Sequence, residues 1–344
     1  MRTNTGRFLR MSPRTVRHLS SAAIVFALAS PHSAAAAPDQ TGKAPAAPAP
    51  SSPSKKIPSS SSQKSFSSPR AAGDALIAAA DPYDVAALKA NFGPDGASLV
   101  VTKDAVLDKL QGEAFAAKAR EKSAIVLDEK NPDRATLTVG NEDWPMPIPI
   151  VRKGGKWFFD SKAGRKEVLY RRIGRNELDA IEVCHDFVDA QHAYALEKHD
   201  DSAVNQYAQK IISTPGKQDG LAWRSADGTP EGPLGDTIAH AIAEGYTKKT
   251  EKPEPFHGYY FKVLKGQGPA APLGKMDFVV KGAMIGGFAL AATPAEYRVT
   301  GVKTFIVSHR GVVHEKDLGP KTLEQFQAMD RYNPDKTWTP VMEP

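Results

Sequence analysis

One long stretch of helical periodicity, from Asp160 to His199, constrains the fold more than any other part of the sequence. From Asn176 onward, side chains recur at the i, i+3, i+4 and i+7 spacing that places them on one face of an α-helix. That face must be covered, because a stripe of this size left exposed would be an apolar patch. The stripe consists of Ala180, Ile181, Cys184, Phe187, Val188, Gln191, Tyr194 and Ala195.

The chain before this helix predicts a small α+β domain over residues 71–163. Two short helices follow Ala71, and a longer one is expected from Asp104 to Lys122. Three strand-like runs come next, SAIVLDE, ATLTVG and PIPIVRKGGKWFFD, the last with a turn at its two glycines. Helices followed by a meander of strands are typical of the α+β class. This order resembles the cystatin-like and nuclear-transport-factor-two-like domains, in which helices and a curved sheet enclose a pocket.

The chain after the start of the helix predicts a second domain over residues 164–344. Short helices are expected at Val204–Ile211, Leu234–Tyr246 and Leu323–Met329. Five strand-like runs precede the last of them, HGYYFKVL, DFVVKG, GGFALAAT, TGVKTFIVSH and GVVHEKD. Their apolar residues alternate with more polar ones, as half-buried antiparallel strands require. We therefore predict that the long helix packs on this sheet, against Phe261, Val263, Phe288, Leu290, Phe305 and Val307.

Residues 1–37 have the succession of a secretory signal peptide: five arginines, the apolar run SSAAIVFALAS, and four alanines. The apolar run is shorter than the roughly 20 residues of a membrane span, so we expect cleavage and no permanent membrane anchor. Without these arginines the formal charge falls from +6 to +1, which removes the compositional support for a nucleic-acid partner. Residues 38–70 are rich in Pro, Ser and Ala, and we expect a disordered linker there.

Few residues suggest catalysis or a cofactor. Cys184 is the only cysteine, so no intramolecular disulfide forms, and its place on the apolar stripe predicts a buried, unreactive thiol. His185, Asp189 and His192 lie on one side of the helix at a spacing that suits a divalent metal ion. They lack an identifiable fourth ligand among charged neighbours, so we expect no metal and no cofactor.

A cluster of arginines lies where the first domain passes into the helix. We predict that Arg171, Arg172 and Arg175 contact carboxylates across the junction between the two domains. Gly174 is expected to interrupt the helix, and Asn176 to cap its continuation.

Several long runs resemble a bacterial family called domain of unknown function 2950. They are DWPMPIPIVRKGGKWFFDSKAG, RRIGRNELDAI, YAQKIISTPGKQDGLAW, HGYYFKVLKGQGPAAP, MIGGFALAATPAEYRVTGVKTFIV and GVVHEKDLG. The likeness runs from about Ala71 to Pro340, and it implies a secreted protein of the cell envelope. It implies no catalytic residues. The second half, a long helix followed by an antiparallel meander, also resembles the globular domains of pilins and pseudopilins, although a whole domain precedes the helix here.

The favoured hypothesis is an exported binding or scaffolding protein without catalytic activity, periplasmic or extracellular, whose partner is an envelope protein or a cell-wall component. One alternative is a hydrolase or isomerase that uses a pocket of the first domain near Trp144 and Trp157. The other is a pseudopilin-like subunit of a pilus or secretion system.

Overall fold

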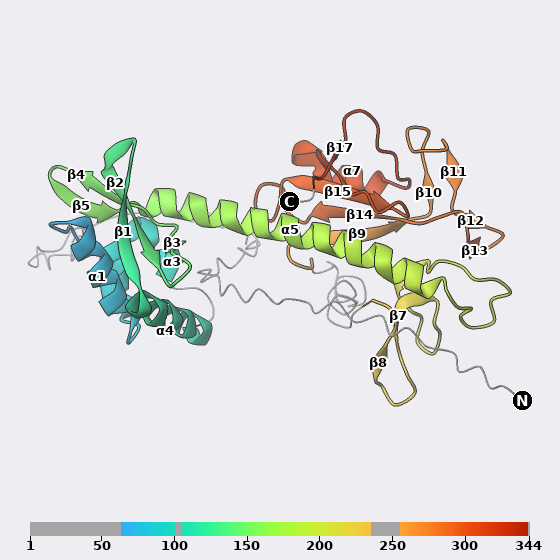
Figure 1. The fold of residues 1–344 in the computed structure, drawn as a ribbon, viewed down its shortest axis with the longest axis horizontal. Helices are drawn as coiled ribbons and strands as arrows, with labels where there is room; N and C mark the ends of the chain where they lie inside the picture. Colours follow the sequence, from blue (N-terminus) through green and yellow to red (C-terminus); the bar gives the residue numbers. More distant parts are fainter. Residues whose placement is uncertain (1–62, 101–104, 235–254, 343–344) are drawn as a thin grey trace, which may run out of the picture. The chain divides into compact units, whose positions relative to one another are not determined.

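The computed structural model describes residues 63–100, 105–234 and 255–342. The chain divides into two compact units, Met1–Arg165 and Lys166–Pro344, whose elements are drawn in Figure 1. Helices and largely antiparallel sheets occur in both, so the predicted α+β class is confirmed. The expected signal peptide, residues 38–62 of the expected linker and residues 235–246 of an expected helix lie outside the described residues.

The helices of the first unit begin and end where the sequence supplies caps. The Ser68 hydroxyl accepts from the amide of Ala71 at 3.1 Å, and the Asp84 carboxylate accepts from Ala86 and Ala87 at 3.0 Å. Gly93, at φ +68°, ends the second helix. The elements are α1 (Pro69–Ala80), α2 (Val85–Phe92), η1 (Pro94–Gly96), α3 (Ala97–Val100) and α4 (Ala105–Glu121).

An antiparallel sheet in the order β1-β2-β4-β5 completes the first unit, with β3 paired to β2. α1 and α4 pack against the sheet, and Phe92 and Phe159 meet edge to face at 5.1 Å in the core. The turn between β4 and β5 is made by Gly154 and Gly155, both at positive φ, as predicted. The strands are β1 (Ser123–Asp128), β2 (Asn131–Val139), β3 (Trp144–Pro145), β4 (Ile150–Lys153) and β5 (Lys156–Phe159).

The last eight residues of the expected linker, 63–70, are ordered, and the prediction for them is wrong. Phe66 exchanges two backbone hydrogen bonds of 2.9 Å with Trp157 on the outer edge of β5, and its side chain is buried. Gln63 donates to the carbonyl of Phe159 at 2.6 Å. A single large aromatic residue gives this otherwise polar segment enough apolar surface to offset its ordering entropy.

The long helix α5 (Ser161–Tyr194) begins in the first unit and continues through the second. It runs through Gly174 without a break, so the predicted interruption is wrong. Asn176 does not cap a new helix but donates to the carbonyl of Thr300 at 2.8 Å. Glycine in a helix interior destabilises the helix by only about 1 kcal/mol relative to alanine. The free energy gained from packing the helical turns on either side of Gly174 exceeds this cost.

The second unit is built around an antiparallel sheet in the order β17-β16-β15-β14-β9. A smaller sheet pairs β6 with β7 in parallel and β7 with β8 in antiparallel fashion. Short ribbons β10-β11 and β12-β13 complete it. The elements after α5 are β6 (Lys210–Ile212), β7 (Gly220–Arg224), β8 (Pro230–Glu231), β9 (Tyr259–Leu264), β10 (Gly266–Gln267), β11 (Met276–Asp277), β12 (Val279–Val280), β13 (Ala283–Met284), β14 (Ala289–Pro294), β15 (Lys303–Ser308), β16 (His314–Asp317), η2 (Gly319–Lys321), α7 (Thr322–Ala328) and β17 (Thr339–Pro340).

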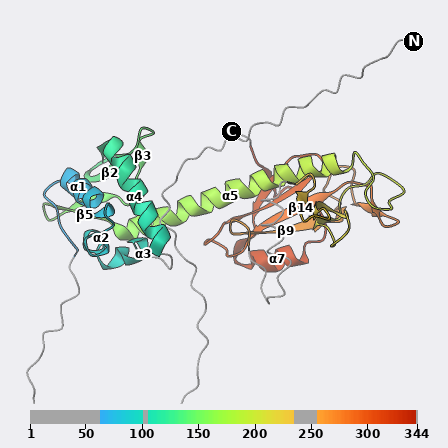
Figure 2. The same ribbon diagram turned by 90° about the horizontal axis from the view of Figure 1, so that it is seen from below.

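The predicted packing of the helix on the sheet is confirmed. Phe187 is 1% exposed and meets Phe288 edge to face at 5.7 Å between ring centroids. Cys184 lies in the same core with Phe261 and Phe305. Figure 2 shows α5 on one face of the β9-β14 sheet and α7 on the other.

The expectation of half-buried strands does not hold at the centre of this sheet. All six residues of β14 are buried, as are five of the six in β15. Because α7 covers the face turned away from α5, the central strands have no solvent-facing side. Their small and hydroxyl residues fit this burial, and Thr293 bonds Thr304 through their hydroxyls at 3.0 Å.

The predicted helix over Val204–Ile211 is wrong: this segment is irregular and ends in β6. Gln191 of α5, which is fully buried, pairs with both backbone groups of Ala208 at 2.8 Å. The side chain of Asn205 donates to the carbonyls of Ala195 and Leu196 at the end of α5. These side chains satisfy backbone groups that a helix would otherwise pair with each other.

Candidate functional site

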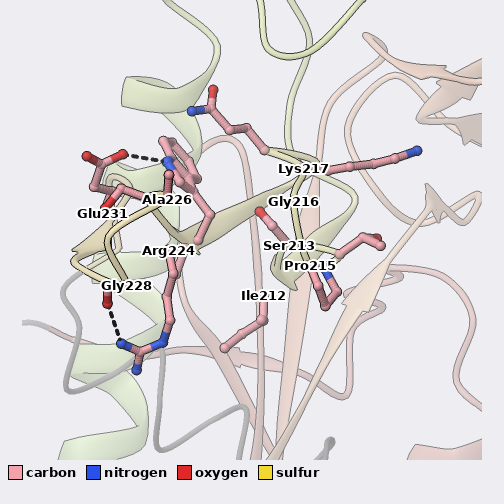
Figure 3. A pocket seen from close by; sticks show the side chains of 14 residues that line it. Ile212, Ser213, Pro215, Gly216, Lys217, Arg224, Ala226, Gly228 and Glu231 are labelled. Atoms are coloured by element: carbon pink, nitrogen blue, oxygen red, sulfur yellow. Dashed lines mark hydrogen bonds between the residues drawn. The ribbon is translucent and has the colours of Figure 1, made fainter.

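A cavity of about 770 Å³ opens beside the small sheet of the second unit (Figure 3). Three segments line it: the end of β6 with the following loop, β7 with the following turn, and Glu231 of β8. Its described lining residues are Ile212, Ser213, Thr214, Pro215, Gly216, Lys217, Gln218, Ala222, Trp223, Arg224, Ser225, Ala226, Gly228 and Glu231. This volume falls in the range of small-molecule sites, about 300–1,000 Å³.

Trp223 is the aromatic residue of this lining. It lies on β7 directly opposite Glu231 of β8, in the register that the hairpin sets. Its indole Nε1–H donates to Glu231 Oε2 at 3.0 Å, the bond drawn in Figure 3. The ring is half-buried and packs against the core of the unit. A tryptophan fixed by its one polar atom offers a rigid apolar surface at low entropic cost.

The loop on the other wall is held by Asp219. Its carboxylate accepts from the Thr214 amide at 2.7 Å, from the Thr214 hydroxyl at 2.8 Å and from Lys210 Nζ at 2.7 Å. Burial raises the pKa of Asp219, but the hydrogen bonds from Lys210 and Thr214 outweigh it and lower the pKa to about 2. Gly216, at φ +78°, makes the turn at the tip of this loop.

The turn after β7 is held by Asp227 in a similar way. Its carboxylate accepts from the Ser225 hydroxyl at 2.5 Å and from the Thr229 amide at 3.0 Å. These bonds, the one from Ser225 above all, lower the pKa of Asp227 to about 2. Gly228 closes the turn at φ +85°, and its carbonyl accepts from Arg224 at 2.9 Å. Both walls of the cavity are thus fixed by an ionised aspartate.

Two stacked aromatic rings, those of Tyr194 and His199, lie next to the Trp223 ring. The rings of Tyr194 and His199 are nearly parallel with centroids 3.8 Å apart, and His199 lies 5.6 Å from Trp223. The Tyr194 hydroxyl donates to the carbonyl of Gln218 at 2.5 Å, which ties the end of α5 to the loop. Burial raises the pKa of Tyr194 to about 12, so the phenol keeps its proton at neutral pH.

The described lining residues supply few groups of the kind that take part in bond cleavage. They include neither histidine nor cysteine, and the carboxylate of Glu231 is engaged by the indole of Trp223. The Ser213 hydroxyl accepts from the amide of Gly220 at 2.9 Å and has no general base beside it among these residues. Hydroxyl, amide and cationic groups surround the aromatic ring instead, the pattern of a binding pocket.

A second cavity, of about 310 Å³, involves residues that hold the same loop. Tyr194, His199, Lys210 and Asp219 line it, and Lys265 contributes a further cation. Lys210 and Asp219, which hold a wall of the first cavity, therefore also line the second.

Two of the arginines predicted to join the domains, Arg171 and Arg172, have contacts within the second unit. Arg171 pairs with Glu167 one turn earlier on α5, at 2.8 Å. Arg172 Nη2 donates to the carbonyl of Val299 at 3.1 Å, and burial lowers its pKa while Glu296 opposes the shift. Arg175 is exposed. These partners belong to the second unit, and a role for the three arginines between the domains stays a prediction.

The same part of α5 fastens the turn between β14 and β15. The carboxylate of Glu177 accepts from the amides of Val302 and Lys303 at 2.8 and 3.0 Å. Asp179 pairs with His257 at 2.6 Å. Glu177 thus anchors the hairpin formed by β14 and β15 to α5.

The histidines considered as metal ligands do not come together with other ligands. His185 is half-buried, Asp189 is exposed, and His192 packs its ring on Phe288 at 5.4 Å. In the described ranges no three His, Cys, Asp or Glu residues are grouped so as to hold a metal ion. Cys184 is fully buried, as predicted, and desolvation raises its thiol pKa to about 12.

Neither tryptophan proposed for a pocket of the first unit lines either cavity. Trp157 is 7% exposed and stacks under the guanidinium of Arg152, while Trp144 forms the short strand β3 opposite Val139. Trp223 is not among the candidate residues that the sequence alone suggests. The signal that marks it is the pair of Gly- and Pro-containing turns, STPGKQDG and SADGTPEG, on either side of a single strand.

The fold and the site together define a two-unit α+β protein with a ligand-sized cavity on its second unit. A family model described as "Protein of unknown function (DUF2950)" matches residues 63–341, and the chain belongs to this family. No curated protein and no solved structure matches the chain. Among the helices in the described ranges, none has both the length and the apolar character to cross a membrane.

Proposed function

We propose that the protein is an exported binding protein of the cell envelope, and that it holds a glycan fragment of the cell wall in the cavity beside Trp223. The observation that carries the proposal is the fixed, half-buried indole of Trp223 in a cavity of about 770 Å³ whose other polar side chains include hydroxyls, an amide, two cations and the carboxylate that holds the indole. A sugar ring has an apolar face that stacks on an aromatic side chain, and hydroxyl edges that bond to polar groups around it. The signal-peptide pattern of residues 1–37 supports export.

The absence of a nucleophile and base pair among the described lining residues favours binding without catalysis. Among the described lining residues there are two cations, Lys217 and Arg224, and one carboxylate, Glu231, which favours a fragment that carries negative charge, such as a sugar with a carboxylate or its attached acidic peptide.

Binding of muropeptides, released from purified cell wall by a muramidase, tests this proposal by calorimetry and tryptophan fluorescence. We expect Trp223→Ala to weaken binding at least tenfold, while Trp338→Phe, which changes a tryptophan outside the cavity lining, leaves it unchanged. Equal affinities of the two variants would refute the assignment of the site. Chemical conversion of the muropeptides by the wild-type protein would refute a purely binding role.

A further inference from the structure

The two edge strands of the sheet in the first unit, β1 and β5, differ in whether the backbone groups on their outer side are hydrogen-bonded. The edge at β5 is closed by Phe66, whose amide and carbonyl both pair with Trp157. Among the strands in the described part of the chain, β2 alone lies beside β1, at the other edge. Among the described residues, the backbone groups of Ile125 and Leu127 have no hydrogen-bond partner beyond the β1-β2 ladder. An unpaired edge of this kind is a template for a further strand.

The direction of these backbone groups follows from two bonds. The carbonyl of Lys122 accepts from the amide of Gly140, so Lys122 faces β2. The carbonyl of Ser123 accepts from Arg70 at 3.3 Å, so Ser123 faces away from β2. Since alternate residues of a strand direct their backbone groups to opposite sides, Ile125 and Leu127 present N–H and C=O to the open edge.

The side chains of β1 itself carry none of the usual protection against pairing from Ser123 to Leu127, and Arg70 of α1 reaches the edge only at the Ser123 carbonyl. Residues 123–127 read SAIVL and contain neither a charge nor a proline. Val126 and Leu127 are each 53% exposed. β1 is six residues long, a common length for a strand that pairs along its whole extent.

We propose that β1 is a homodimerisation edge, on which the β1 of a second copy of this chain adds in antiparallel fashion to make one continuous sheet. When two antiparallel strands are related by a twofold axis, the residue at the axis lies opposite the same residue of the other copy. If its backbone N–H and C=O point outward from the sheet edge, these two residues form a hydrogen-bonded pair. Ile125 meets this condition at the centre of β1. Ser123 then lies opposite Leu127, and Lys122 lies opposite Asp128 at both ends.

The charges favour this register and this partner. Pairing about Ile125 places a lysine against an aspartate twice, whereas pairing about Val126 places Lys122 against Lys130. Both side chains of the favourable pair are accessible, Lys122 at 46% and Asp128 at 40% exposure, and pairing across the axis replaces or extends their exposed ion pairs with Asp143 and Arg134. A single added strand buries less than the roughly 1,200 Å² of standard interfaces, so the dimer is expected to depend on protein concentration.

Sedimentation equilibrium of the full chain tests the proposal. Leu127→Pro removes one outward N–H without touching the ladder to β2, and Leu127→Ala is its matched control, which keeps that N–H. We expect a monomer–dimer equilibrium in the wild type, with a dissociation constant raised at least tenfold in Leu127→Pro and less in Leu127→Ala. A chain that is monomeric at every concentration, or a dimer that Leu127→Pro leaves unchanged, overturns the proposal.

A charge reversal tests the register and remains decisive if Leu127→Pro does not fold. Lys122→Glu and Asp128→Lys should each weaken the dimer, because each places like charges opposite one another, and the double variant should restore it. Single variants without effect, or a double variant that stays monomeric while circular dichroism shows it folded, would contradict antiparallel pairing about Ile125.

Discussion

Truncation of Phe187 to alanine measures how far the second unit depends on the packing of α5 against its sheet. The Phe187 side chain is 1% exposed and meets the Phe288 ring edge to face at 5.7 Å. Its removal loses the burial of a large aromatic group and leaves a cavity that rigid neighbours on the sheet fill only in part. Such Phe→Ala changes cost about 3–5 kcal/mol, and the lost aromatic pair is worth about 0.5–1.5 kcal/mol beyond area burial, so we expect a loss of about 4 kcal/mol.

The matched control is Glu182→Ala, an exposed residue on the same helix, for which we expect a change below about 0.5 kcal/mol. Urea unfolding followed by tryptophan fluorescence reports on both units, because Trp223 and Trp338 lie in the second and Trp144 and Trp157 in the first. The loss should appear in the transition of the second unit. Small and equal effects of the two substitutions would refute the view that the helix–sheet interface holds this unit together.

Two further predictions follow from single residues. Gly174→Ala should stabilise the protein by about 0.5–1 kcal/mol, because the added methyl meets no atom within 4 Å in an unbroken helix. Gly164→Ala should destabilise it by about 1–3 kcal/mol, because its methyl would lie 2.6 Å from Ile148. Thermal unfolding that ranks the two variants in the opposite order would contradict this. The lowered pKa of Asp219 means that its hydrogen bonds stabilise the loop fully above about pH 4 and are lost as the pH falls toward 2. The difference in melting temperature between wild type and Asp219→Asn should therefore shrink over that interval. A difference independent of pH would show that the carboxylate charge is not what holds the loop.

Local sequence determined most of the secondary structure. The caps at Ser68 and Asp84, the glycine pair at the β4–β5 turn and the apolar stripe of α5 each specify a feature through interactions within a few residues of the chain. The burial of Cys184 and the packing of the helix on a sheet follow from the same periodic stripe, because an apolar face of that size requires a cover.

Tertiary structure decided what depended on partners distant in sequence. The segment at Ala208 is irregular and not helical because the buried Gln191 pairs with its backbone, and residues 63–70 are ordered because Phe66 closes the edge of β5. The cavity is likewise a tertiary feature: Trp223 gains its role only when Glu231 holds its indole and α5 brings His199 behind it. Periodicity encodes which face of an element is apolar. It does not encode which polar group from a distant part of the chain will contact that element. The candidate site is built from such long-range contacts.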